Sequence, residues 1–172
     1  MKRFTDKIVV VTGGSSGIGL AAAVEFQREG ATVVVTGRTD DALSAAAKTL
    51  GGTAIAIKAD VTKASDMEAL FKQVKSKFGR IDVLFANAGV AKLGSIEETD
   101  EPLLADMMDT NFKGAFFAAK SALPLLSEGG AIVFTTSFFV DVGLAGTSAV
   151  SASKAALRSL TRTLAPKLRA SS

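Results

Sequence analysis

Short apolar runs alternate along the chain with longer segments in which apolar residues recur every three or four positions. The short runs predict five β-strands, at residues 7–12, 31–36, 53–58, 81–86 and 131–136. Each run is apolar at almost every position, which is typical of strands buried on both faces of a parallel sheet. The alternation therefore predicts an α/β fold with helices on both faces of a doubly wound parallel sheet.

The longer segments predict helices at residues 17–28, 40–50, 65–78, 101–126 and 148–169, of which 101–126 is expected to be broken. Asp40 and Ser65 stand where N-caps are expected, and Pro166 should kink or end the last helix. Glycines follow three helices as C-caps would, at Gly30, Gly51 and Gly79. No repeat or linker divides the sequence, so we expect one domain over residues 1–172.

Composition and charge exclude several classes of function. The net charge of +3 comes from scattered Lys and Arg, so we expect no nucleic-acid partner, and no segment is long enough to predict a membrane span. The chain has no Cys, which predicts no thiolate metal site and a reducing cytoplasm as its compartment. It also has no His, Tyr or Trp, so acid–base chemistry is left to Asp, Glu, Lys, Ser and Thr.

A glycine-rich turn joins the first strand to the first helix. Its sequence is Thr12-Gly13-Gly14-Ser15-Ser16-Gly17-Ile18-Gly19. Glycines let the backbone approach a pyrophosphate closely, and a helix N-terminus offers free N–H groups and the positive end of its dipole. Taken alone, the turn is also consistent with a purely structural bend.

Further motifs follow the glycine turn in order: Asp60-Val61 after the third predicted strand, Asn87-Ala88-Gly89 after the fourth, Asn111 in the long helix, Ser137 after the fifth strand and Lys154 in the last helix. Together they resemble the short-chain dehydrogenase/reductase family. The resemblance implies a Rossmann-like sheet with strand order 3-2-1-4-5 and a dinucleotide cofactor. The implied cofactor-binding residues are Gly13, Ser15, Ser16, Gly17, Ile18, Gly19, Arg38, Asp60, Val61, Asn87, Ala88, Gly89 and Lys154. The implied catalytic residues are Asn111, Ser137 and Lys154, with Asn111 structural and relaying protons and Ser137 orienting the substrate.

The end of the second predicted strand bears on the choice of cofactor. A carboxylate there would accept hydrogen bonds from the adenosine ribose, whereas an Arg would receive a 2′-phosphate. The sequence has Gly37 followed by Arg38, which favours NADP(H). Asp40 and Asp41 nearby keep NAD(H) as the alternative.

The family's catalytic tyrosine is missing from this sequence. In the family a Tyr stands four residues before the matching lysine, but the residue four before Lys154 is Val150. Without a phenol to supply the proton, normal turnover is not expected. The resemblance also implies further strands and a substrate lid beyond Ser172, so the fold is expected to be truncated at its C-terminus.

These features leave two hypotheses open. The first is an NADP(H)-dependent oxidoreductase that transfers hydride between nicotinamide and a small carbonyl or alcohol substrate, impaired as written. The second is a non-catalytic nucleotide-binding or oligomerisation module. The family associates through the helix after strand four and the helix of the lysine, which predicts a homodimer or homotetramer. Small residues in those helices are Ala115, Ala118, Ala119, Ala152, Ala155 and Ala156.

Overall fold

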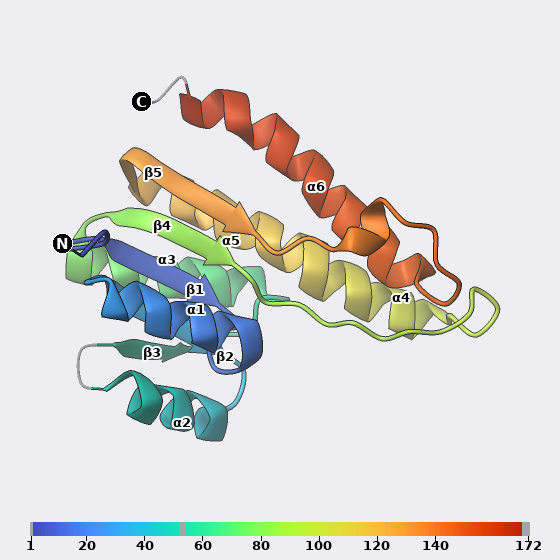
Figure 1. Ribbon diagram of the computed structural model, residues 1–172, viewed down its shortest axis with the longest axis horizontal. Coiled ribbons are helices and arrows are strands. Elements are labelled where there is room, and N and C mark those ends of the chain that lie inside the picture. The colour runs from blue at the N-terminus through green and yellow to red at the C-terminus, as the bar shows by residue number, and fades with distance from the viewer. Residues whose placement is uncertain (1, 52–53, 170–172) are drawn as a thin grey trace.

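The computed structural model describes residues 2–51 and 54–169, and its centre is a parallel β-sheet (Figure 1). The strands are β1 (Ile8–Thr12), β2 (Thr32–Gly37), β3 (Ile55–Lys58), β4 (Ile81–Ala86) and β5 (Leu126–Phe134). They lie in the order β3-β2-β1-β4-β5, and every neighbouring pair is parallel. The predicted α/β class, the Rossmann-like sheet and its strand order are confirmed.

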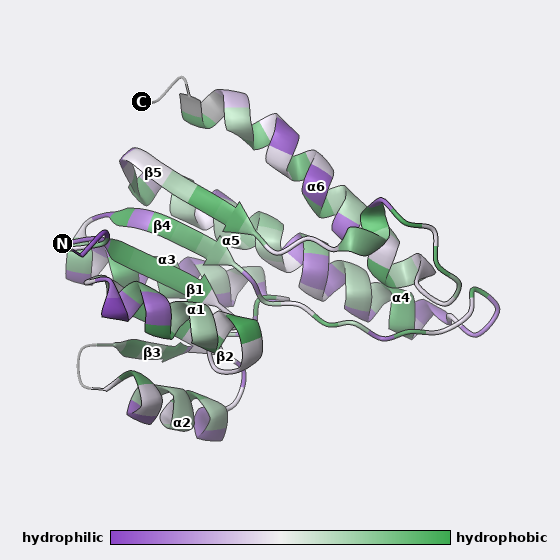
Figure 2. Ribbon diagram, in the orientation of Figure 1, coloured by the Kyte–Doolittle hydropathy of each residue, from purple (hydrophilic) through white to green (hydrophobic). Residues whose placement is uncertain are grey.

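Burial of the strands depends on their place in the sheet. Every residue of β1 is buried, whereas β3 and β5 alternate between half-buried and exposed positions. The prediction that all five strands are buried on both faces is therefore wrong for these two. They are the edge strands, and each has a strand neighbour on one side only. Figure 2 shows apolar residues along the edge strands as well as the central ones, so the difference in burial comes from position in the sheet rather than from composition.

Two strands differ from their predicted limits by more than one residue at an end. β5 begins at Leu126 rather than at residue 131, because Leu126 already pairs with Ile81 before a shift in register. It ends at Phe134, so Thr135 and Thr136 belong to the loop that follows. β3 begins at Ile55, and residue 53 of the predicted strand lies outside the described residues.

Six α-helices are assigned in the described part of the chain. They are α1 (Gly17–Arg28), α2 (Asp40–Leu50), α3 (Ala64–Phe78), α4 (Glu101–Met108), α5 (Gly114–Ala122) and α6 (Ser148–Arg169). A π-helical turn, η1 (Asp109–Lys113), joins α4 to α5, and a 3₁₀ turn, η2 (Leu123–Leu125), follows α5. The predicted break within residues 101–126 is therefore confirmed.

The helix ends differ in part from the prediction. The N-caps are Thr39 and Lys63, not Asp40 and Ser65, because the carbonyls of Thr39 and Lys63 accept the first hydrogen bonds of their helices. Gly30, Gly51 and Gly79 do adopt positive φ after their helices, as expected for C-caps. The last helix does not end at Pro166, which is exposed and lies in its final turn.

Two apolar layers hold the helices to the sheet. One face carries α1 and α2, where Val9, Val11, Val33 and Val35 of the central strands are fully buried. The opposite face carries α3, α5 and α6, and its core includes Leu70, Ala118 and Leu157. Because the strands are parallel, their carboxyl ends meet at a single edge of the sheet, and the loops that leave this edge form the site described next.

Candidate cofactor and catalytic site

The glycine turn leaves β1 at Thr12 and enters α1 at Gly17. Gly13 and Gly17 have φ of +64° and +51°, in the left-handed region that favours glycine. The turn exposes Ser15, Ser16 and Ile18 to a pocket at the carboxyl edge of the sheet. The N-terminus of α1 therefore points its free backbone N–H groups toward this pocket.

The turn also has no room for side chains at two positions. A Cβ on Gly13 would lie 2.8 Å from the Cα of Ala88, and a Cβ on Gly19 would overlap the carbonyl oxygen of Gly13. The backbone of the turn is thus packed directly against the loop after β4. A surface formed by bare backbone amides is the kind of cradle that paired phosphates require, so these residues fit a dinucleotide.

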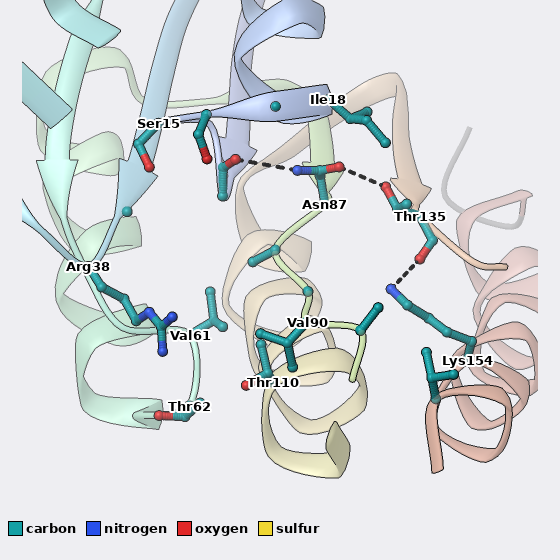
Figure 3. Close-up of a pocket in the computed structure, with 18 of the residues that line it drawn as sticks. Ser15, Ile18, Arg38, Val61, Thr62, Asn87, Val90, Thr110, Thr135 and Lys154 are labelled. Carbon is teal, nitrogen blue, oxygen red and sulfur yellow. Dashed lines mark hydrogen bonds between the residues drawn. The ribbon is translucent and has the colours of Figure 1, made fainter. Parts of the chain in front are cut away.

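A polar network ties the turn to β4 and to the segment after β5. The hydroxyl of Thr12 accepts from the backbone N–H groups of Asn87 and Ala88, at 3.1 and 3.2 Å. The Asn87 amide donates to the carbonyl oxygens of Thr12 and Gly13 at 3.4 Å, and its Oδ1 accepts from the Thr135 hydroxyl at 3.1 Å. Figure 3 shows Asn87 between the turn and Thr135. The network fixes the relative position of three strand ends.

Arg38 follows β2 and lies at the end of the pocket opposite Lys154. No ion pair or hydrogen bond of its guanidinium is found among the described residues, and it faces the pocket (Figure 3). Asp40, by contrast, pairs with Lys58 at 2.6 Å. The positive charge of Arg38 is therefore available to an anion, whereas the Asp40 carboxylate of α2 is already paired with Lys58.

Asp60 lies beside Arg38, in the loop after β3. Partial burial disfavours its charged form, but hydrogen bonds from Thr62 at 2.8 and 3.0 Å and the nearby positive charge of Arg38 hold its pKa below the ordinary value. The carboxyl group is therefore ionised at neutral pH and kept in one orientation. It lines the pocket together with Val61 and Thr62.

Lys154 projects from α6 into the pocket at the end nearest β5. Its ammonium donates a hydrogen bond of 2.7 Å to the Thr135 carbonyl oxygen (Figure 3), and burial lowers the pKa of this lysine. A Cβ on Gly89 would lie 3.2 Å from the Lys154 Nζ. The ammonium is therefore held between the loops that follow β4 and β5.

Val150 occupies the same side of α6, one turn before Lys154, and also lines the pocket. It is 3% exposed and packs with Met107, Ala149 and partly buried Phe139. Neither neighbouring hydroxyl stands in for a phenol: Ser148 is exposed, and the Ser151 hydroxyl donates to the Phe139 carbonyl at 2.8 Å. This side of the pocket is apolar where a proton donor would be needed.

The remaining two predicted catalytic residues differ in their access to the pocket. Ser137 lines it and begins the 3₁₀ turn η3 (Phe138–Val140), where its hydroxyl accepts from the Phe139 N–H at 3.3 Å. Asn111, in η1, is fully buried and does not line the pocket. Its amide donates to the Val90 carbonyl and the Ser153 hydroxyl at 2.9 and 3.0 Å, which joins η1 to the β4 loop and α6.

The pocket has a volume of about 480 Å³ and brings together nearly all the predicted site residues. Only Gly19 and Asn111 are not among its lining residues, and both support the backbone that forms it. Sequence reasoning missed several lining residues that flank the motifs, whose proximity to those motifs was the available signal: Gly37, Ala59, Thr62, Val90, Ala91, Thr110, Thr135, Thr136 and Phe139.

Within residues 2–51 and 54–169, no three His, Cys, Asp or Glu side chains gather as ligands of a metal ion. No helix in the same ranges combines the length and apolar character needed to cross a bilayer.

Comparison with known proteins places the chain among oxidoreductases. It is 38% identical over 171 residues to an oxidoreductase of Sarocladium schorii, with 98% of this chain and 69% of that protein covered. A 3β-hydroxysteroid dehydrogenase of Mediterraneibacter gnavus is 36% identical, with 96% of this chain and 62% of the relative covered. The chain thus spans about two thirds of the length of these relatives.

The fold has close structural counterparts as well. The solved structure of a mutant short-chain dehydrogenase/reductase from Serratia marcescens superposes with a TM-score of 0.87 and 34% identity, over 95% of this chain and 70% of that one. The sequence pattern that defines short chain dehydrogenases matches residues 7–172. The chain belongs to the short chain dehydrogenase family.

Proposed function

We propose that residues 1–172 form one dinucleotide-binding domain that takes NADP(H) and, as written, reduces a small carbonyl substrate or oxidises the corresponding alcohol only slowly. The observation that carries this proposal is Val150, which is buried in the pocket wall one turn before Lys154. The family resemblance puts the proton donor at this position. The chain therefore keeps the residues proposed to bind the cofactor and lacks the residue that would donate the proton.

The cofactor would be held by groups at both ends of the pocket. The amides at the start of α1 suit the pyrophosphate, and Asp60 and Val61 suit the adenine ring. Arg38, without an ion pair among the described residues, suits a 2′-phosphate, and Gly37 supplies no carboxylate for a free 2′-hydroxyl. Since Asp40 is paired with Lys58, NADP(H) is preferred and NAD(H) is the weaker alternative.

The catalytic end can bind a carbonyl but lacks the phenol that the family uses to protonate it. When bound, the reduced nicotinamide supplies a hydride for the carbonyl carbon, and the oxygen must then gain a proton. The Ser137 hydroxyl is placed to orient the carbonyl oxygen, and Lys154 is placed to hold positive charge near it. Val150 has no proton to donate, and the Lys154 ammonium is engaged by the Thr135 carbonyl at 2.7 Å, so proton transfer to the substrate oxygen is slow.

Replacing Val150 tests this proposal directly. Val150→Tyr should raise the rate of NADPH oxidation with a panel of ketones that includes a 3-ketosteroid, by about 10²- to 10⁴-fold. Val150→Phe is the matched control, because it adds the same ring without the hydroxyl and should stay at the wild-type rate. Wild-type turnover as fast as that of Val150→Tyr would contradict the proposed impairment.

The second candidate function, a non-catalytic dinucleotide-binding module that self-associates, has support from α6. Ala152 and Ala155 are exposed on this helix, and Phe116 of α5 is 40% exposed, so these residues are free to meet a second copy. The alanines of α5 are not, since Ala115, Ala118 and Ala119 are buried in the chain's own core. Sedimentation should detect a dimer or tetramer, and a monomer that binds no dinucleotide would exclude this function.

The compartment remains a prediction from composition. A chain without cysteine gains nothing from an oxidising environment, and NADP(H) is an intracellular reductant, so we propose the cytoplasm. Fractionation of expressing cells would test this location.

A further inference from the structure

The hydroxyl of Thr110 differs from several other helical hydroxyls among the described residues. Thr49, Ser153 and Thr161 each donate to a carbonyl of the preceding turn of their own helix, at 3.1, 2.8 and 3.1 Å. Thr110, in η1, is 5% exposed, yet its Oγ1 has no hydrogen-bond partner. It is the single buried side-chain polar atom in this condition within the described ranges. Because buried polar groups are normally paired, this hydroxyl calls for a partner outside the chain.

Thr110 lines the pocket at the end formed by the loop after β3. Gly114, four residues further on, packs against Val61 of that loop, since a Cβ on Gly114 would lie 2.9 Å from the Val61 Cβ. Figure 3 shows Thr110 near Val90 and Thr62, across the pocket from Lys154. The unpartnered hydroxyl therefore belongs to the end of the pocket that Asp60 and Val61 form.

A second hydroxyl at this end of the pocket, that of Thr62, already has a hydrogen-bond partner. The Thr62 hydroxyl donates to the Asp60 carboxylate at 2.8 Å, so it has no proton left to offer a ligand. Val61 and Val90 provide apolar surface suited to the faces of a flat base. A planar ring with acceptor nitrogens at its edge, attached to an acceptor-rich ribose, matches this combination of apolar walls and an unpaired hydroxyl donor.

We propose that Thr110 donates a hydrogen bond to the adenosine moiety of the bound dinucleotide, as an additional residue that selects this half of the cofactor. The inference rests on the proposed dinucleotide function and deepens it. The hydroxyl is then unpaired in the free protein and paired in the complex. Replacing it by an apolar group of equal size should therefore weaken binding without weakening the fold.

Thr110→Val tests the inference, because valine keeps the shape of threonine and removes only the hydroxyl. Calorimetric titration should show about threefold to tenfold weaker binding of NADPH and of adenosine 2′,5′-bisphosphate. Reduced nicotinamide mononucleotide, which lacks the adenosine half, should bind with unchanged affinity. Thr110→Ser should keep wild-type affinity for all three ligands. The free Thr110→Val protein should melt at the wild-type temperature or above it.

Thr161→Val is the matched control, since it also removes a helical threonine hydroxyl but lies outside the pocket. It should leave all three affinities unchanged. If Thr110→Val and wild type bound adenosine 2′,5′-bisphosphate with equal affinity, the inference would be overturned. The proposed function would still stand in that case, provided that wild type bound NADPH. A lower melting temperature with equal weakening of both half-ligands would assign Thr110 a structural role instead. If wild type binds no NADPH, the proposed function and this inference fail together.

Discussion

The two ends of the pocket differ in how their chemistry depends on sequence. The phosphate end is formed mainly by backbone: the free amides of α1, and Gly13 and Gly19 where no Cβ fits. The catalytic end depends on single side chains, of which Ser137 and Lys154 are present and the phenol is not. Backbone amides are present whatever the side chains are, so a site formed by them does not depend on one residue. A proton donor, by contrast, is lost by a single substitution. We therefore propose that this chain binds a dinucleotide while its turnover is slow.

Val150 also shows why this loss leaves the fold intact. The valine packs against Met107, Ala149 and Phe139, so the wall of the pocket stays closed and apolar. The Lys154 ammonium retains its carbonyl partner at Thr135 and does not depend on a phenol for its position. The proposed catalytic end is therefore well packed but lacks the family's phenol, while the proposed phosphate end keeps both its packing and its backbone amides.

The largest effect on NADPH binding should come from crowding the glycine turn at the phosphate end. In Gly19→Val the new side chain would overlap the Gly13 carbonyl and crowd the Asn87 amide, so the turn must move. We expect NADPH affinity to fall by about 100-fold or more, given the usual cost of overpacking. Gly143→Ala is the control, because a Cβ there meets no atom within 4 Å. Near-wild-type affinity in Gly19→Val would show that the turn does not hold the phosphates.

A smaller and more selective effect is expected at Arg38. Arg38→Ser removes the guanidinium proposed to receive the 2′-phosphate, so NADPH binding should weaken by roughly 10- to 100-fold, the value of charge-assisted hydrogen bonds. NADH binding should be unchanged, since it has no 2′-phosphate. Parallel calorimetric titrations with both cofactors provide the measurement. Equal losses for the two cofactors would remove the basis for NADP(H) preference.

The smallest effect on binding should come from Asp82, at the opposite edge of the sheet. This carboxylate accepts from the Ile8 N–H at 2.9 Å and from Lys7 at 3.1 Å. Burial opposes its ionisation, but these hydrogen bonds, with one from Ser127, hold its pKa below the ordinary value. Asp82→Asn should lower the free energy of unfolding by about 1–3 kcal/mol at neutral pH and leave NADPH affinity unchanged.

The direction in which the stability from Asp82 changes with pH follows from its lowered pKa. A carboxyl group with a lower pKa in the folded state contributes stability above its unfolded pKa of about 3.9, and this contribution is lost as pH falls through the folded value. Acid titration of unfolding should therefore show a shallower loss of stability in Asp82→Asn than in wild type. Parallel curves would mean that Asp82 does not contribute this stability.

Much of the fold and the site could be predicted because local patterns encode them. The apolar runs located all five strands, and the spacing of Gly13, Gly17 and Gly19 located the turn. The limits of β5 could not be predicted, because they depend on the pairing of Leu126 with Ile81 rather than on residue type. The N-caps at Thr39 and Lys63 likewise depend on where the backbone turns.

The residues missed at the site depend on packing between distant segments. Nothing near Thr110 in the sequence shows that η1 will bury its hydroxyl without a partner, because that follows from a π-helical turn and its contact with the loop of Val61. Phe139 reaches the pocket through η3, which has no sequence motif of its own. Sequence motifs thus locate the site residues that recur in a family. The structure adds the pocket residues that depend on how this chain packs.

A calorimetric titration of the wild-type protein with NADPH and NADH tests the central claim most directly. Binding by a preformed phosphate cradle predicts saturable heat with one NADPH per chain, a dissociation constant in the micromolar range and weaker binding of NADH. If neither cofactor produced saturable heat at millimolar concentration, the glycine turn would be only a structural bend, and the separation of binding from catalysis would be wrong.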